Sequence, residues 1–125
     1  MFKPQDEFPL MEEYKKKFDI TKDTIFALYP YIYTNNPLTP DILVHELVHF
    51  KQQEKVGVVE WVYDFLENPK LRLEYELEAY REQLKSIKDR NHRNRVRVES
   101  ARNLSSSLYG NIIGYSDAFD LLKVK

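Results

Sequence analysis

The sequence predicts a single, predominantly helical α+β domain over residues 1–125, with a small antiparallel sheet near its N-terminal end. The chain has 125 residues, 42% of them hydrophobic, which is enough for one modest core. Two runs rich in β-branched and aromatic residues, at 24–29 and 31–34, are typical of strands. Most of the remaining chain places apolar residues three and four positions apart, as amphipathic helices do.

The central helix is expected to start at Thr39-Pro40-Asp41. Thr39 would be the N-cap, Pro40 the first helical residue, and Asp41 would favour the positive end of the helix dipole. Val56 would be its last residue, because Gly57 is a typical helix stop. Pro30, which lacks an N–H, marks an edge, bulge or break between the two strands. The ends of the other expected segments are marked by capping residues, by Gly or by Pro. These segments are helices at 10–18, 59–66, 69–88, 96–108 and 116–122, and a polar basic link at 90–95.

Composition excludes several classes of function. The chain has no cysteine, so disulfides, thiolate metal sites and a cysteine nucleophile are excluded. A formal net charge of −1 argues against general nucleic-acid binding, and the basic link is expected to be solvated. No apolar run approaches the roughly 20 residues of a membrane span, and the N-terminal residues lack the apolar core of a secretion signal. We therefore expect a cytoplasmic protein without a membrane partner, and leave the oligomeric state open.

His45 and His49 are the candidate metal ligands of the central helix. Four residues apart, they differ by about 40° around the helix axis, so both imidazoles leave the same face about 5–6 Å apart. That separation suits two bonds to one Zn²⁺ ion. Glu46 lies about 60° further round than His49, beside the ion but poorly placed to bind it. This is the position of a general base that takes a proton from an activated water.

A catalytic zinc site needs a third protein ligand, and the next long helix offers Glu74, Glu76 and Glu78. Glu76 falls on the apolar, core-facing stripe of that helix, whereas Glu74 and Glu78 fall on its charged face. A carboxylate on a buried face needs a metal or a partner. Glu76 is therefore the preferred third ligand, and an ion pair between Glu76 and Arg72 is the alternative.

With these residues in place, the chain resembles the gluzincin metallopeptidases. It looks closest to the minimal, single-domain zincin-like versions found in bacterial and phage genomes. The likeness covers roughly residues 24–88 and is carried by His45, Glu46, His49 and Glu76. It implies an active-site helix packed against a glutamate helix, and a sheet whose edge strand binds extended peptide. The family's Asp that orients a ligand imidazole would fall at Tyr80, so Asp41 is an alternative for that role.

The expected function is zinc-dependent hydrolysis of a peptide or protein substrate, with endopeptidase activity favoured over exopeptidase activity. Tyr80, His92 and Tyr109 are the candidates for stabilising the oxyanion. The alternatives are a catalytically silent zinc module with a structural or partner-binding role in a phage or regulatory system, and a nucleic-acid module that uses Arg93, Arg95 and Arg97.

Overall fold

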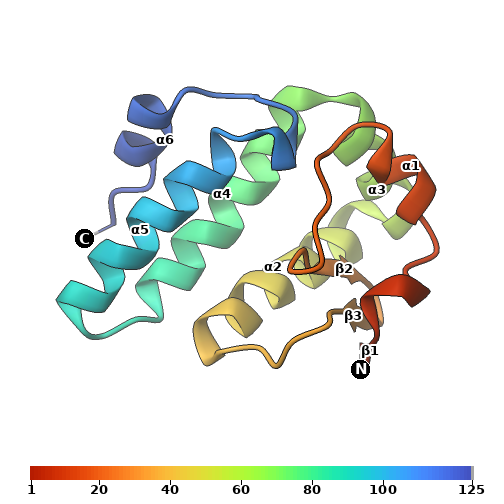
Figure 1. The fold of residues 1–125 in the computed structure, drawn as a ribbon, viewed down its shortest axis with the longest axis horizontal. Coiled ribbons are helices and arrows are strands. Elements are labelled where there is room, and N and C mark those ends of the chain that lie inside the picture. The colour runs from red at the N-terminus through yellow and green to blue at the C-terminus, as the bar shows by residue number, and fades with distance from the viewer. Residues whose placement is uncertain (125) are drawn as a thin grey trace.

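The computed structural model describes residues 1–124 as a helical domain with a small sheet at one side (Figure 1). The strands are β1 (Phe2–Lys3), β2 (Phe26–Leu28) and β3 (Tyr31–Tyr33). The helices are α1 (Met11–Lys15), α2 (Pro40–Val56), α3 (Val58–Glu67), α4 (Pro69–Lys85), α5 (Arg90–Leu104) and α6 (Tyr115–Leu121). Two short 3₁₀ turns are η1 (Gln5–Glu7) and η2 (Ser107–Tyr109).

The sheet is mixed, which corrects the expectation of a purely antiparallel one. Its order is β1-β3-β2, with β2 antiparallel and β1 parallel to β3. The antiparallel hairpin was expected, and Pro30 lies in its turn. β1 was missed because a strand of two residues is too short to show an alternating pattern. Its partner strand also lies far along the chain, since Phe2 pairs with Ile32, 30 positions later. The segment between β1 and β2 brings the chain back to the same side, so β1 and β3 run in the same direction (Figure 1).

The helices that carry the candidate site begin and end close to the expected residues. Asn68 caps α4 by accepting a hydrogen bond from the Leu71 N–H at 3.1 Å, and Pro69 is the first helical residue. Gly57 separates α2 from α3 with a φ of +94°, a conformation that favours glycine. Thr39 precedes α2, but its hydroxyl donates to Asp41 at 2.7 Å instead of capping the helix. α4 ends at Lys85, three residues before the expected end.

The expected basic link at 90–95 is wrong, because these residues form the first turns of α5. Asp89 caps that helix by accepting a hydrogen bond from the His92 N–H at 2.8 Å. Most side chains of these turns face solvent, so they show no apolar stripe from which a helix could be recognised. α5 also ends early, at Leu104, and η2 occupies the segment expected to complete it.

Two hydrophobic clusters flank α2 and α4, the two helices of the site. An aromatic cluster joins α1, β2, β3 and α3, and its buried members are Phe8, Tyr14, Phe18, Phe26, Tyr33, Trp61 and Phe65. A more aliphatic cluster joins α4, α5 and α6, and its buried members are Leu77, Tyr80, Leu84, Ala101, Leu104, Ala118 and Leu122. The two helices therefore have packed side chains on both sides, which fixes their relative position.

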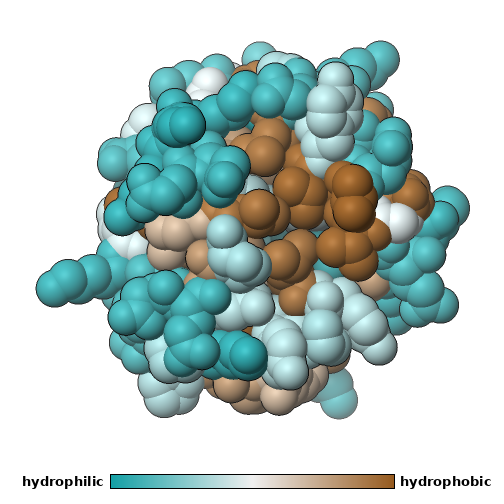
Figure 2. Space-filling view, turned by 90° about the vertical axis from the view of Figure 1, so that its right-hand side faces the viewer, coloured by the Kyte–Doolittle hydropathy of each residue, from teal (hydrophilic) through white to brown (hydrophobic). Residues whose placement is uncertain are grey.

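Apolar surface gathers on the face at the right of Figure 1, where α1 and α3 lie, as Figure 2 shows. Among the large exposed apolar side chains, Val59 and Tyr63 of α3 are 85% and 64% exposed. Within residues 1–124, no helix has both the length and the apolar character that crossing a bilayer requires.

Candidate metal centre

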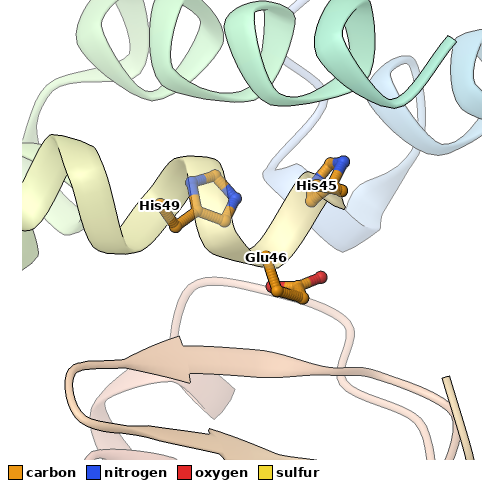
Figure 3. Close-up of side chains that lie close together, drawn as sticks. All are labelled: His45, Glu46 and His49. Carbon is orange, nitrogen blue, oxygen red and sulfur yellow. The ribbon is translucent and has the colours of Figure 1, made fainter. Parts of the chain in front are cut away.

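Three buried side chains from α2 and α4 meet at one point. The Nε2 atom of His45 lies 3.1 Å from one carboxylate oxygen of Glu76, and the Nε2 atom of His49 lies 3.0 Å from the other. None of the three residues is more than 5% exposed. Figure 3 shows both imidazoles on the side of α2 that faces α4. The structure therefore brings together the three residues expected to bind the metal.

The alternatives for the third ligand lie elsewhere. The guanidinium of Arg72 donates to the backbone carbonyls of Tyr109 and Phe65, and makes no ion pair with Glu76. Glu74 and Glu78 are exposed on the opposite face of α4. The angular argument from the sequence thus selected the carboxylate that faces the two imidazoles.

A glutamine side chain holds each imidazole at its other nitrogen. The Nδ1 of His45 lies 3.0 Å from the Oε1 of Gln83, whose amide nitrogen donates to Asp41 at 2.8 Å. Asp41, the alternative for the orienting role, therefore reaches His45 only through Gln83. Tyr80, where the resemblance implies an orienting aspartate, packs its ring edge-on against His45, with centroids 4.4 Å apart.

The second imidazole has a matching support. The Nδ1 of His49 lies 2.9 Å from the Oε1 of Gln52, and the indole N–H of Trp61 donates to the same oxygen at 3.0 Å. The amide nitrogen of Gln52 donates to the Tyr75 carbonyl at 3.0 Å and to Glu78 at 2.7 Å. An indole N–H can only donate, and a carbonyl or carboxylate can only accept. The orientation of the Gln52 amide is therefore fixed, and the bond from Gln83 to Asp41 fixes that of Gln83.

These amides decide which nitrogen of each imidazole carries a proton. Each Nδ1 faces an acceptor oxygen, so Nδ1 carries the proton. In the neutral rings of His45 and His49, both Nε2 lone pairs then point at the oxygens of Glu76. Lone pairs facing one another at this distance repel, unless a cation lies among them. Two imidazoles and a carboxylate are also a donor set that zinc prefers, so these residues fit the metal.

Without a metal, a proton is the cation that the site can take. Burial alone would lower the pKa of His49, but the charge of Glu76 and its hydrogen bond outweigh burial and raise that pKa to about 9. Burial alone would raise the pKa of Glu76, but the charge of His49 and hydrogen bonds from both imidazoles hold it far below its usual range. The centre therefore attracts positive charge and keeps its carboxylate ionised.

Glu46 lies on the other side of α2 and points toward the sheet (Figure 3). It is only 6% exposed, and it has no hydrogen bond or ion pair with any residue from 1 to 124. Possible ligand atoms of His45, Glu46 and His49 lie within 4.8 Å of one another, so Glu46 is close enough to the imidazoles to reach an ion held by them. Burial raises the pKa of Glu46, against the opposing charges of the two imidazoles. A buried carboxylate without a partner, facing a cavity, is suited to accept a proton.

A cavity of about 380 Å³ adjoins these residues. His45, Glu46, His49 and Glu76 all line it. Much of its remaining wall is aromatic and comes from Phe8, Tyr14, Phe26, Trp61, Phe65, Tyr80 and Tyr109. The candidate metal centre is thus buried at the inner wall of a cavity large enough for part of a peptide.

Among the tyrosines of the cavity, Tyr14 was not singled out from the sequence. It is 5% exposed, and its hydroxyl has no hydrogen-bond partner in the described part of the chain. Burial and the nearby charge of Glu76 raise its pKa, so the hydroxyl stays protonated. Of the expected candidates, Tyr80 and Tyr109 hydrogen-bond to each other at 3.0 Å, and His92 is exposed at the start of α5, outside the cavity wall.

Two of the arginines of α5 contribute to the fold. Arg93 donates to the backbone carbonyl of Ile87, and Arg97 donates to that of Phe119 at 2.9 Å with its guanidinium 3.7 Å from the ring centre. Arg95 is exposed. Two of the three arginines considered for nucleic-acid binding are thus engaged in packing α5.

Comparisons with protein-family models, curated proteins and solved structures give no match to this chain. The functional argument is therefore built on the geometry of the site.

Proposed function

We propose that this protein is a zinc-dependent peptidase in which His45, His49 and Glu76 bind the metal. One observation carries the proposal: two imidazole Nε2 atoms and both oxygens of Glu76 converge within 3.1 Å in a buried centre, with both imidazoles oriented by Gln52 and Gln83. Such a centre is costly unless a cation neutralises it. Glutamine amides that hold the far nitrogens of both rings are what a metal-binding pair of histidines requires.

When bound, zinc would supply a Lewis acid that acidifies a water molecule and polarises a carbonyl. Glu46 would accept the proton of that water and pass it to the departing amine nitrogen. Its burial supports this role, because burial raises the pKa of Glu46 and so makes its carboxylate a stronger base toward the proton of the water. The absence of a partner among residues 1–124 leaves its oxygens free for the reaction.

Tyr14 is the proposed hydrogen-bond donor to the carbonyl oxygen as that oxygen gains negative charge. Its hydroxyl is protonated and lies in a buried, largely aromatic wall, where a hydrogen bond to an anion is stronger than in water. Tyr80 and Tyr109 satisfy each other and are held by packing, so they are less suited to this task.

Replacement of Glu46 by Gln tests the mechanism. The amide keeps the shape of the side chain but cannot accept the proton, so we expect peptidase activity to fall by roughly 10²- to 10⁴-fold while the zinc content stays unchanged. Glu54→Gln, an exposed change on the same helix, is the matched control. Full activity of Glu46→Gln contradicts the mechanism. Stoichiometric zinc with no activity in either protein, across a broad set of peptides, supports a catalytically silent zinc module instead.

A further inference from the structure

The backbone of β2 offers an open edge to the cavity, and this edge bears on the substrate. Ile32 of β3 donates its N–H to the Met1 carbonyl of the first strand at 2.8 Å, so it faces β1. In an antiparallel pair, the residue opposite such a position turns its own N–H and C=O away from the ladder. That residue is Ala27, and Ile25, two positions earlier, points the same way. Both residues line the cavity.

Gln53 closes one end of this edge. Its amide nitrogen donates to the Ala27 carbonyl at 2.8 Å, and its amide oxygen accepts from the Tyr29 N–H at 2.9 Å. Gln53 is 1% exposed and thus takes the place that the backbone of a neighbouring strand would occupy. The N–H and C=O of Ile25 and the N–H of Ala27 remain available. An added peptide can therefore pair over about three residues, and beyond Gln53 it must leave the strand.

Toward the other end of β2, the cavity is lined by carboxylates from three different elements. Asp23 precedes β2, Asp41 begins α2, and Glu99 lies on α5. Asp23 accepts from the Asn36 amide at 3.1 Å and Asp41 from the Gln83 amide at 2.8 Å. Within residues 1–124, none of the three has an ion-pair partner, and neither Lys nor Arg lines the cavity.

Negative charge on Asp23, Asp41 and Glu99 repels an acidic peptide. It attracts Lys and Arg side chains, whose charge can reach these carboxylates while the backbone pairs with β2.

Building on the proposed peptidase function, we propose that the substrate is a basic peptide. A short extended stretch pairs with Ile25 and Ala27 beside the metal centre, and Lys or Arg follows it on the side of Asp23, Asp41 and Glu99. Because Gln53 blocks the opposite end, the charge preference applies to one side of the paired stretch only.

A set of synthetic peptides with one neutral core tests this inference. Lys-Lys or Glu-Glu is added at either end of the core, and kcat/KM is measured with the zinc-loaded full chain. Binding to zinc-loaded Glu46→Gln is measured in parallel by fluorescence anisotropy. At one end of the core, we expect kcat/KM to be about tenfold higher with Lys-Lys than with Glu-Glu, as a few exposed charge pairs would produce. At the other end, the two peptides should give nearly equal values. The preference should weaken as salt is raised.

Two charge-reversed variants provide the matched comparison. Glu99→Lys, in the wall of the cavity, should abolish most of the preference, whereas Glu54→Lys, an exposed change of equal charge outside the cavity wall, should leave it intact. Equal use of Lys-Lys and Glu-Glu peptides overturns the substrate inference while the peptidase function stands. A Lys-Lys preference in binding without cleavage by the wild-type chain supports the inference and contradicts peptidase activity. Neither binding nor cleavage contradicts both.

Discussion

Zinc binding should tighten as the pH rises toward 9, because the metal and a proton compete for the Nε2 of His49. In the metal-free protein, burial alone would lower the pKa of His49, but Glu76 raises it to about 9. The ring is then protonated at pH 7, and binding of zinc must displace that proton. The pKa of Glu76 lies far below this range, so Glu76 has no proton to lose. The apparent association constant should therefore fall about tenfold per pH unit below pH 9.

From pH 9 to pH 7 this competition weakens zinc binding about 100-fold, which corresponds to about 2.7 kcal/mol at 1.36 kcal/mol per pH unit. Isothermal titration calorimetry at pH 7, in two buffers of different ionisation enthalpy, gives the number of protons released per zinc bound. We expect the contribution of His49 to be about one proton at pH 7 and to shrink as the pH approaches 9. His92→Gln, at an exposed position, should not change this value. A zinc affinity that is independent of pH, with no proton released on binding, would refute the competition between zinc and a proton for His49.

Three further changes have expected outcomes. Tyr14→Phe removes only the hydroxyl that faces the cavity, so kcat in a peptide-cleavage assay should fall roughly 10- to 1,000-fold while the zinc content stays unchanged. A variant with the kcat of the wild type would exclude Tyr14 as the hydrogen-bond donor to the oxyanion. Gln83→Met removes the support of the His45 ring, so zinc affinity in a chelator competition should fall about 10- to 100-fold. An unchanged affinity would show that Asp41 and Gln83 do not matter to the metal. Leu84→Ala opens a cavity at a 0% exposed position and should lower the free energy of unfolding by about 2–5 kcal/mol in urea denaturation. A decrease of less than about 1 kcal/mol would contradict the packing of Leu84 in the core.

Helical periodicity was sufficient to predict that His45, His49 and Glu76 face one another. The spacing of His45 and His49 is local, and Glu76 could be separated from Glu74 and Glu78 because only Glu76 shares the apolar stripe of its helix. Packing that stripe against α2 brings its carboxylate to the imidazoles. Gln83 was also within reach of this reasoning, since seven residues after Glu76 it falls on nearly the same helix face.

Other parts of the site depend on contacts that periodicity does not encode. Tyr14 lies on the apolar stripe of its short helix, so the sequence indicated a core residue, and only the tertiary fold shows that its hydroxyl meets the cavity. Gln53 follows the metal-binding segment, but its role depends on how α2 packs against β2. Similarly, β1 becomes a strand only because residues far along the chain provide its partner.

Metal analysis of the purified chain tests the central claim most directly. After zinc loading and dialysis, mass spectrometry should find one zinc per chain in the wild type and in Glu74→Gln, an exposed control on the same helix. Glu76→Gln should lose most of the metal, because its amide cannot supply the charge that balances zinc between the two imidazoles. A wild-type chain that retains no zinc, or a Glu76→Gln variant that retains as much as the wild type, would contradict the claim.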